Sequence, residues 1–215
     1  MATPQPAIAP RAVTPWRRGS VSPWLIWVLV SVLGAVLGAL AAWQTRSLVG
    51  GGSGLLQQDL AYVATGLNVL ISAGAQWLVL RRFRVDAYWW VPATIVAELV
   101  AVTFIVPGVF NLLYAQPPGS PVIGTAMFAG ASALGAAGLL VGVIQSVVLR
   151  SSARNLAWLW IPATMLGGAF AGALTTALSS QLLGLPPFAT VSLVAATGGL
   201  FTAACQAPIV ARIAR

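Results

Sequence analysis

The strongest constraint on the fold of this chain is a passage of sequence that occurs twice. Residues 76–81 read Gln-Trp-Leu-Val-Leu-Arg and lead into Trp-Trp-Val-Pro-Ala-Thr at 89–94. Residues 145–150 read Gln-Ser-Val-Val-Leu-Arg and lead into Trp-Leu-Trp-Ile-Pro-Ala-Thr at 158–164. Self-similarity between apolar segments is typical of membrane proteins built by duplication of a helical hairpin.

The apolar content supports a membrane protein. The chain is 59% hydrophobic and 7% charged, whereas soluble domains are roughly half apolar and a quarter charged. A helix needs about 20 apolar residues to cross a hydrocarbon core about 30 Å thick. The sequence therefore predicts an all-α protein with six transmembrane helices, which we expect at 24–43, 60–80, 88–110, 122–149, 156–179 and 188–210.

The six spans pair into three repeated hairpins, at about 24–80, 88–149 and 156–210. The outgoing span of each hairpin begins with Trp and soon carries a hydroxyl, and the returning span ends in Gln followed by Arg. The hydroxyls are Ser31, Thr94 and Thr164, and the glutamines are Gln76, Gln145 and Gln206. The first hairpin is the weakest match. Its outgoing span has some features of a cleaved signal peptide, but it is long for one and aligns with the later spans, so we expect a retained helix.

The charges predict the orientation. All eleven basic residues are Arg, and ten of them lie before the first span, after the last, or in the two links between hairpins, leaving only Arg46 on the other side. By the positive-inside rule both termini are cytoplasmic, and we expect a bacterial inner (plasma) membrane. Since the Arg residues flank apolar spans, the expected partner is the lipid bilayer and not nucleic acid. Residues 1–22, rich in Pro, Ala and Thr, predict a disordered cytoplasmic tail before a six-helix transmembrane domain at 23–215.

The scarcity of reactive side chains argues against an enzyme. The chain has no His, three acidic residues and a single cysteine, Cys205. Metal, haem and Ser-His-Asp chemistry all need residues that are missing here. We therefore predict no catalytic residues, no cofactor and no metal.

Small residues recur one turn apart in three of the spans. The pairs are Gly34 and Gly38, Gly138 and Gly142, and Gly168 and Gly172. Such GxxxG pairs let helix backbones approach closely. They predict either packing inside one bundle or a surface that docks another membrane subunit.

The glutamines and tryptophans each have two interpretations. Gln76, Gln145 and Gln206 lie at a depth similar to that of Thr94 and Thr164, so amide-to-hydroxyl bonds can join neighbouring helices. The alternative is a ring of glutamines that gates a pore. Eight of the nine tryptophans lie in the tail or toward the cytoplasmic ends, which indicates an interfacial aromatic belt. A cage for an aromatic cofactor or pigment is the alternative.

Glu98 is the acidic residue placed near mid-membrane. Ionisable residues in a span are costly, which makes them functional candidates. One interpretation is a neutral carboxyl that hydrogen-bonds Asn68 in the second span, since burial disfavours the charged form. The other is an ion or proton site.

The blocks at 76–82 and 89–94 resemble those of uncharacterised bacterial multi-pass membrane proteins, which repeat a Gln-Trp-x-x-Leu-Arg end and a Trp-rich, Ala-Ser/Thr start. The resemblance covers roughly 70–170 and implies the hairpin repeat without implying a site or an activity. Mitochondrial carriers also have three two-span repeats, but this chain lacks their Pro-x-Asp/Glu-x-x-Lys/Arg motif.

These features lead to two functional expectations. The first is a non-catalytic accessory or scaffold subunit that packs with other membrane proteins, because polar groups are few and small-residue faces many. The second is a small-solute or ion permease or channel that uses Glu98. A lipid-modifying enzyme is a third and weaker option, since no nucleophile has a recognisable base. A continuous polar cavity that contains Glu98 would favour transport, and a dry core would favour the scaffold.

Overall fold

The computed structural model describes residues 21–48, 55–83, 85, 87–114, 123–182 and 184–214, and these form helices and no strand. The predicted tail lies almost wholly outside the described residues. Six segments are long and apolar enough to cross a membrane, which confirms the prediction of an all-α protein with six spans. The helices are α1 (Pro23–Leu48), α2 (Leu55–Arg82), α3 (Trp90–Val100), α4 (Val106–Tyr114), α5 (Ile123–Leu149), α6 (Trp160–Ala177), α7 (Ser179–Leu182) and α8 (Pro187–Ile213).

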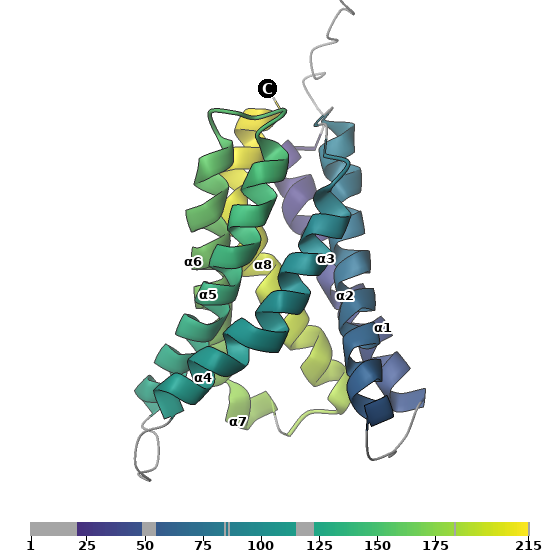
Figure 1. Ribbon diagram of the computed structural model, residues 1–215, viewed down its shortest axis with the longest axis vertical. Helices are drawn as coiled ribbons and strands as arrows, with labels where there is room; N and C mark the ends of the chain where they lie inside the picture. The colour runs from purple at the N-terminus through teal and green to yellow at the C-terminus, as the bar shows by residue number, and fades with distance from the viewer. Residues whose placement is uncertain are drawn as a thin grey trace, which may run out of the picture.

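The spanning helices form a ring in chain order (Figure 1). Helix α1 packs on α2, α2 on α3, α3 on α5, α5 on α6 and α6 on α8, and α8 closes the ring against α1. The contact between α5 and α6 is the most extensive, and the two contacts of α3 with α2 and α5 are the least extensive in the ring. Helix α3 is also the shortest helix of the ring, and the segments that continue its span pack on α5 as well. Duplication of the hairpin stays a prediction.

Prolines mark where the helices begin. Pro23 and Pro187 are the first residues of α1 and α8, and Pro92 and Pro162 are the third residues of α3 and α6. The first N–H groups of a helix have no partner within the helix, so a residue without an N–H costs little there. The Trp-x-Pro-Ala-Thr passages thus lie at helix starts.

The third span, predicted at 88–110, is interrupted. Helix α3 passes at Ala101–Ile105 into a π-helical turn, in which the N–H of Val106 bonds the carbonyl of Ala101, five residues back. Pro107 follows directly; it lacks an N–H, and its ring crowds the carbonyl four residues earlier, so the α-helical hydrogen-bond pattern is disrupted here. Helix α4 then runs obliquely toward the start of α5 (Figure 1).

Glycines permit the closest helix contacts. A Cβ atom on Gly138 of α5 would lie 2.5 Å from the carbonyl oxygen of Thr164 in α6. A Cβ atom on Gly38 of α1 would lie 2.5 Å from the carbonyl oxygen of Asn68 in α2. Neither separation is compatible with a side chain unless the helices move apart. The other members of the three GxxxG pairs also face neighbouring helices of the same bundle: Gly34 faces α2, Gly142 faces α6, and Gly168 and Gly172 face α5.

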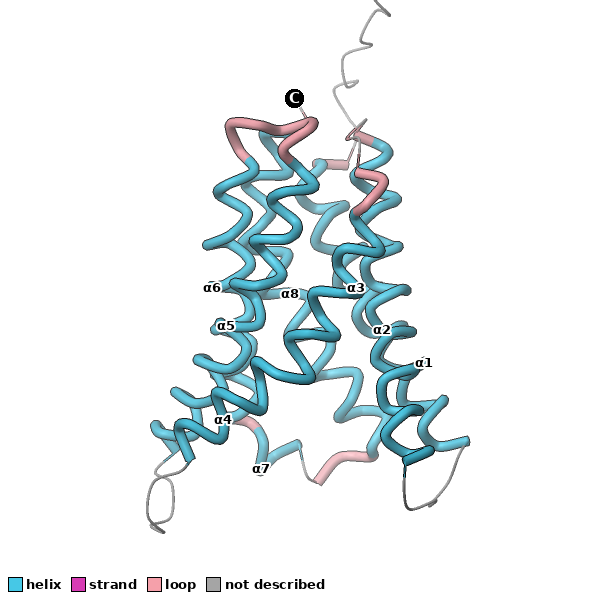
Figure 2. The backbone as a smooth tube through the Cα atoms, viewed as in Figure 1, coloured by secondary structure: helices cyan, strands magenta, loops and turns pink. Residues whose placement is uncertain are grey.

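The two ends of the bundle differ. One end, here called the arginine-rich end, carries the exposed side chains of Arg81, Arg82, Arg150, Arg154 and Arg212. Most of the buried apolar core lies toward this end, around three tryptophans. The helices diverge toward the opposite end (Figure 2). The bundle is thus packed tightly at one end and opens toward the other.

Candidate functional site

Three interhelical hydrogen bonds form one layer across the bundle. Gln76 Nε2 donates to Ser31 Oγ over 3.3 Å. Gln145 Nε2 donates to Thr94 Oγ1 over 3.0 Å, and Gln206 Nε2 donates to Thr164 Oγ1 over 2.9 Å. In each case the glutamine of a returning helix bonds the hydroxyl of the outgoing helix of its own hairpin. We call this layer the glutamine tier.

The tier confirms the prediction that Gln76 or Gln145 would reach Ser31, Thr94 or Thr164. Interhelical hydrogen bonds of this kind contribute about 0.5–2 kcal/mol each in a bilayer. Gln145, Gln206, Thr94 and Thr164 are buried, so these bonds are shielded from water. The tier therefore joins the helices of each hairpin and fixes where each glutamine points.

Three tryptophans pack against one another next to the tier. Trp27, Trp90 and Trp160 are fully buried, and each lies four residues before the hydroxyl residue of its helix. Their ring centroids lie 5.5 Å apart for Trp27 and Trp160, 5.5 Å for Trp90 and Trp160, and 6.4 Å for Trp27 and Trp90, and all three pairs meet edge to face. This arrangement is favourable by about 0.5–1.5 kcal/mol per pair beyond the burial of area. We call it the tryptophan triangle.

The triangle corrects the interpretation of the tryptophans as an interfacial belt. Exposed side chains of Trp24, Trp89 and Trp158 fit a belt, but the triangle residues lie in the protein core. The signal in the sequence was the shared spacing, Trp followed four residues later by Ser or Thr in all three hairpins. The sequence also places Ser72 on one stripe of the second span with Asn68 and Gln76, but it gave no signal for Thr202, because nothing in the apolar pattern around that residue distinguishes the inward face.

Hydrogen bonding between triangle and tier is unequal around the ring. The indole Nε1 of Trp160 donates to Gln145 Oε1 over 2.8 Å. Trp27 Nε1, Trp90 Nε1 and Gln206 Oε1 are buried and have no hydrogen-bond partner among the described residues. The indole of Trp160 is thus paired with Gln145, while the indole donors of Trp27 and Trp90 and the amide oxygen of Gln206 stay unpaired.

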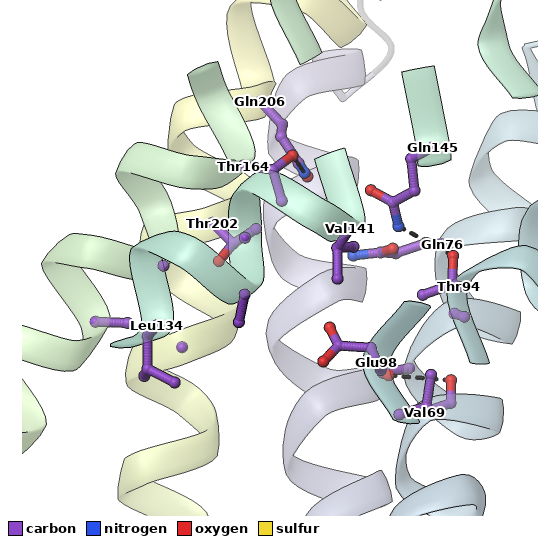
Figure 3. Close-up of a pocket in the computed structure, with 17 residues that line it drawn as sticks. Val69, Gln76, Thr94, Glu98, Leu134, Val141, Gln145, Thr164, Thr202 and Gln206 are labelled. Carbon is purple, nitrogen blue, oxygen red and sulfur yellow. Dashed lines mark hydrogen bonds between the residues drawn. The ribbon is translucent and has the colours of Figure 1, made fainter. Parts of the chain in front are cut away.

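A cavity of about 240 Å³ begins at the tier and extends away from the arginine-rich end (Figure 3). The tier residues Gln76, Gln145, Gln206, Thr94 and Thr164 line its first part, and Ser72, Glu98 and Thr202 line the next. Apolar side chains complete the wall, among them Val69, Leu134 and Val141. Of the residues that line this cavity, only Glu98 is ionisable.

Glu98 points into this cavity (Figure 3). It lies one turn beyond Thr94 on α3, which is about 6 Å along the helix, and three residues before the π-helical turn. None of the described residues forms a hydrogen bond or an ion pair with its carboxylate. An unpaired carboxylate at this depth is costly unless a ligand, a proton or water meets it.

The predicted hydrogen bond between Glu98 and Asn68 is wrong. Asn68 does not line the cavity; its side-chain oxygen lies against Gly38 of α1. Residues four apart on a helix are offset by about 40° around its axis, so the stripe of Asn68, Ser72 and Gln76 winds from the α1 contact into the cavity. Asn68 is thus held at a helix contact and is unavailable to Glu98.

No family model, curated protein or solved structure matches this chain. The site must therefore be interpreted from its own chemistry. The described residues include no group of three or more His, Cys, Asp or Glu side chains close enough to hold a metal. The site contains one carboxyl group, several amide and hydroxyl groups, and apolar walls around a small space. This arrangement is suited to binding a small polar or cationic molecule.

Proposed function

We propose that this integral membrane protein is a non-catalytic permease that binds a small solute or ion in the cavity and passes it across the bilayer. The observation that carries the proposal is Glu98, an ionisable residue that faces a cavity with polar side chains on its wall and has no partner among the described residues. Ionisable residues inside membranes are rare and commonly mark ion or substrate paths. The sequence alone favoured an accessory or scaffold subunit, and the polar cavity is why we now favour transport.

The two ends of the cavity support a directed path. In the proposed orientation the arginine-rich end is cytoplasmic, in a bacterial inner membrane, with both termini inside. The tryptophan triangle and the glutamine tier would then close the cytoplasmic side of the cavity. Solute would enter from the other side, where the helices diverge (Figure 2).

Helix α3 is the element best suited to move. It carries Trp90 of the triangle, Thr94 of the tier and Glu98 of the cavity. The π-helical turn at Ala101–Ile105 follows within one turn of Glu98, and such turns often mark functional sites. A tilt of α3 about this turn would change the triangle, the tier and the cavity together.

Reconstitution into proteoliposomes tests the proposal. Vesicles that hold the purified protein are given labelled sodium, rubidium or ethylammonium ions, and proton flux is followed in parallel with an enclosed pH dye. We expect uptake of at least one of these above that of empty vesicles, loss of uptake in Glu98→Gln, and normal uptake in Gln44→Leu, which removes an exposed amide from the end of α1. Absence of flux for all four probes would contradict the proposal.

An accessory subunit remains the second candidate, because one surface feature favours it. An apolar groove of about 340 Å³ lies between α6 and α8, lined by residues that include Leu159, Leu166 and Ile209, with Arg212 also on its wall. A groove of this kind fits an apolar helix of another membrane protein. Purification in mild detergent, followed by mass spectrometry of wild type and of Leu166→Trp, tests this function. A stoichiometric partner lost in the variant would support it.

A further inference from the structure

Two hydroxyls beside the cavity can only accept a hydrogen bond from a ligand. The hydroxyl of Ser72 donates its proton to the carbonyl of Val69 over 3.2 Å, and that of Thr164 donates to the carbonyl of Trp160 over 2.8 Å. All three glutamines of the tier donate one amide N–H to a hydroxyl of the same hairpin, and each amide keeps a second N–H. The oxygen of Ser72 therefore offers only lone pairs to a ligand.

The orientation of two of the amides follows from their partners. The Thr164 hydroxyl gives its only proton to the carbonyl of Trp160, so it can only accept from Gln206. Gln206 must then present its Nε2 to Thr164, which leaves its Oε1 as the unpaired atom. The indole of Trp160 can only donate, so Gln145 presents Oε1 to it and Nε2 to Thr94.

The charge of the site has one sign. Glu98 faces the cavity, and no Arg side chain lines it. An anion would meet an unpaired carboxylate with no cation to offset it, which is strongly unfavourable at low dielectric. A cation that carries its own N–H donors complements both the carboxylate of Glu98 and the oxygen of Ser72.

The size and walls of the cavity restrict that cation. A volume of about 240 Å³ lies below the range of roughly 300–1,000 Å³ that is typical of sites for drug-sized ligands. Val69, Leu134 and Val141 form an apolar wall beside the polar groups. This combination suits an ammonium group attached to a short carbon chain.

We propose that the cavity is a binding site for a small protonated primary amine. The ammonium group lies beside Glu98, which balances its charge, it donates to the oxygen of Ser72, and its carbon chain lies along the apolar wall. An ammonium group has three donors and no acceptor, which matches the carboxylate and the Ser72 oxygen. This inference rests on the proposed function, for which it names the class of substrate.

Calorimetric titration of the full-length protein in mild detergent, with butylammonium chloride as the probe, tests the inference. We expect saturable binding of butylammonium. Tetramethylammonium, which has the same charge and no N–H, should bind at least tenfold more weakly, as should sodium and potassium. Equal binding of tetramethylammonium or of an alkali ion, or no binding of butylammonium, would overturn the proposal.

Two variants locate the site, and a third is the control. Glu98→Gln should weaken butylammonium binding at least tenfold, Ser72→Ala should weaken it severalfold, and Gln44→Leu should leave it unchanged. Unchanged affinity in Glu98→Gln would overturn the proposal.

The result separates this inference from the proposed function. Saturable amine binding without uptake of any probe into proteoliposomes would support the amine site and contradict the proposal that the protein is a permease. Uptake of rubidium or of protons without amine binding would support the permease and overturn the amine site.

Discussion

At the scale of single residues, two buried indoles of the tryptophan triangle can be compared, because only one of them has a hydrogen-bond partner. Trp160 Nε1 donates to Gln145, whereas Trp27 Nε1 has no partner, although both side chains are fully buried. Replacement by Phe removes the same atoms from each. Only at Trp160 does it also leave a buried amide oxygen without its donor, which costs about 1–3 kcal/mol.

We therefore expect Trp160→Phe to lower the free energy of unfolding by about 1–3 kcal/mol more than Trp27→Phe does. Unfolding in mixed micelles with increasing dodecyl sulfate, followed by circular dichroism, measures the difference. Equal losses in the two variants would mean that the bond between Trp160 and Gln145 contributes no net stability.

Glu98 allows a second prediction at this scale. Its carboxylate has no partner among the described residues, so its conversion to an amide removes a charge from the membrane interior without breaking a bond. Glu98→Gln is expected to unfold at the same or a higher dodecyl sulfate concentration than wild type, while solute uptake is lost. A clear loss of stability would indicate that Glu98 has a structural role.

At the scale of elements, helix contacts depend on which glycines face a neighbour. A Cβ atom on Gly138 would meet the backbone of α6, whereas one on Gly74 of α2 would meet nothing within 4 Å. Both glycines lie inside long helices. Their replacement by Ala brings the same gain in helix propensity, about 1 kcal/mol, and only Gly138 also has a steric cost.

Gly138→Ala is thus expected to lower the free energy of unfolding by about 1–3 kcal/mol, because α5 and α6 must separate to admit the methyl group. Gly74→Ala is expected to raise it by about 0.5–1 kcal/mol. The same micelle titration measures both. A destabilising Gly74→Ala would show that this face of α2 has a contact beyond those within the bundle, as an accessory subunit would require.

At the scale of the whole molecule, orientation and access can be tested together. In a Cys205→Ser background, we expect cysteines at Pro187 and Thr202 to react with an impermeant cationic thiol reagent from the periplasmic side, and a cysteine at Ser152 to react from the cytoplasmic side. Thr202 lines the cavity, which the tryptophan triangle closes from the arginine-rich end. Labelling of the Thr202 position from the cytoplasmic side alone would reverse the proposed direction of access.

The sequence by itself determined the six spans and much of the glutamine tier. Apolar runs of sufficient length have few stable alternatives to a membrane helix, and the spacing of each Gln from its Arg gave the three glutamines similar depths. Shared depth within a hairpin was enough to predict the bonds of Gln76 and Gln145 to hydroxyls.

Only the tertiary structure decided which way the side chains face. In water an apolar stripe marks the buried face of a helix, but in a bilayer both the lipid-facing and the inward faces are apolar, so that signal is lost. For this reason the burial of Trp27, Trp90 and Trp160, and the separation of Asn68 from Glu98, could not be derived from the sequence pattern. The placement of Glu98 in a cavity, on which the proposed function depends, results from how the six helices pack around it.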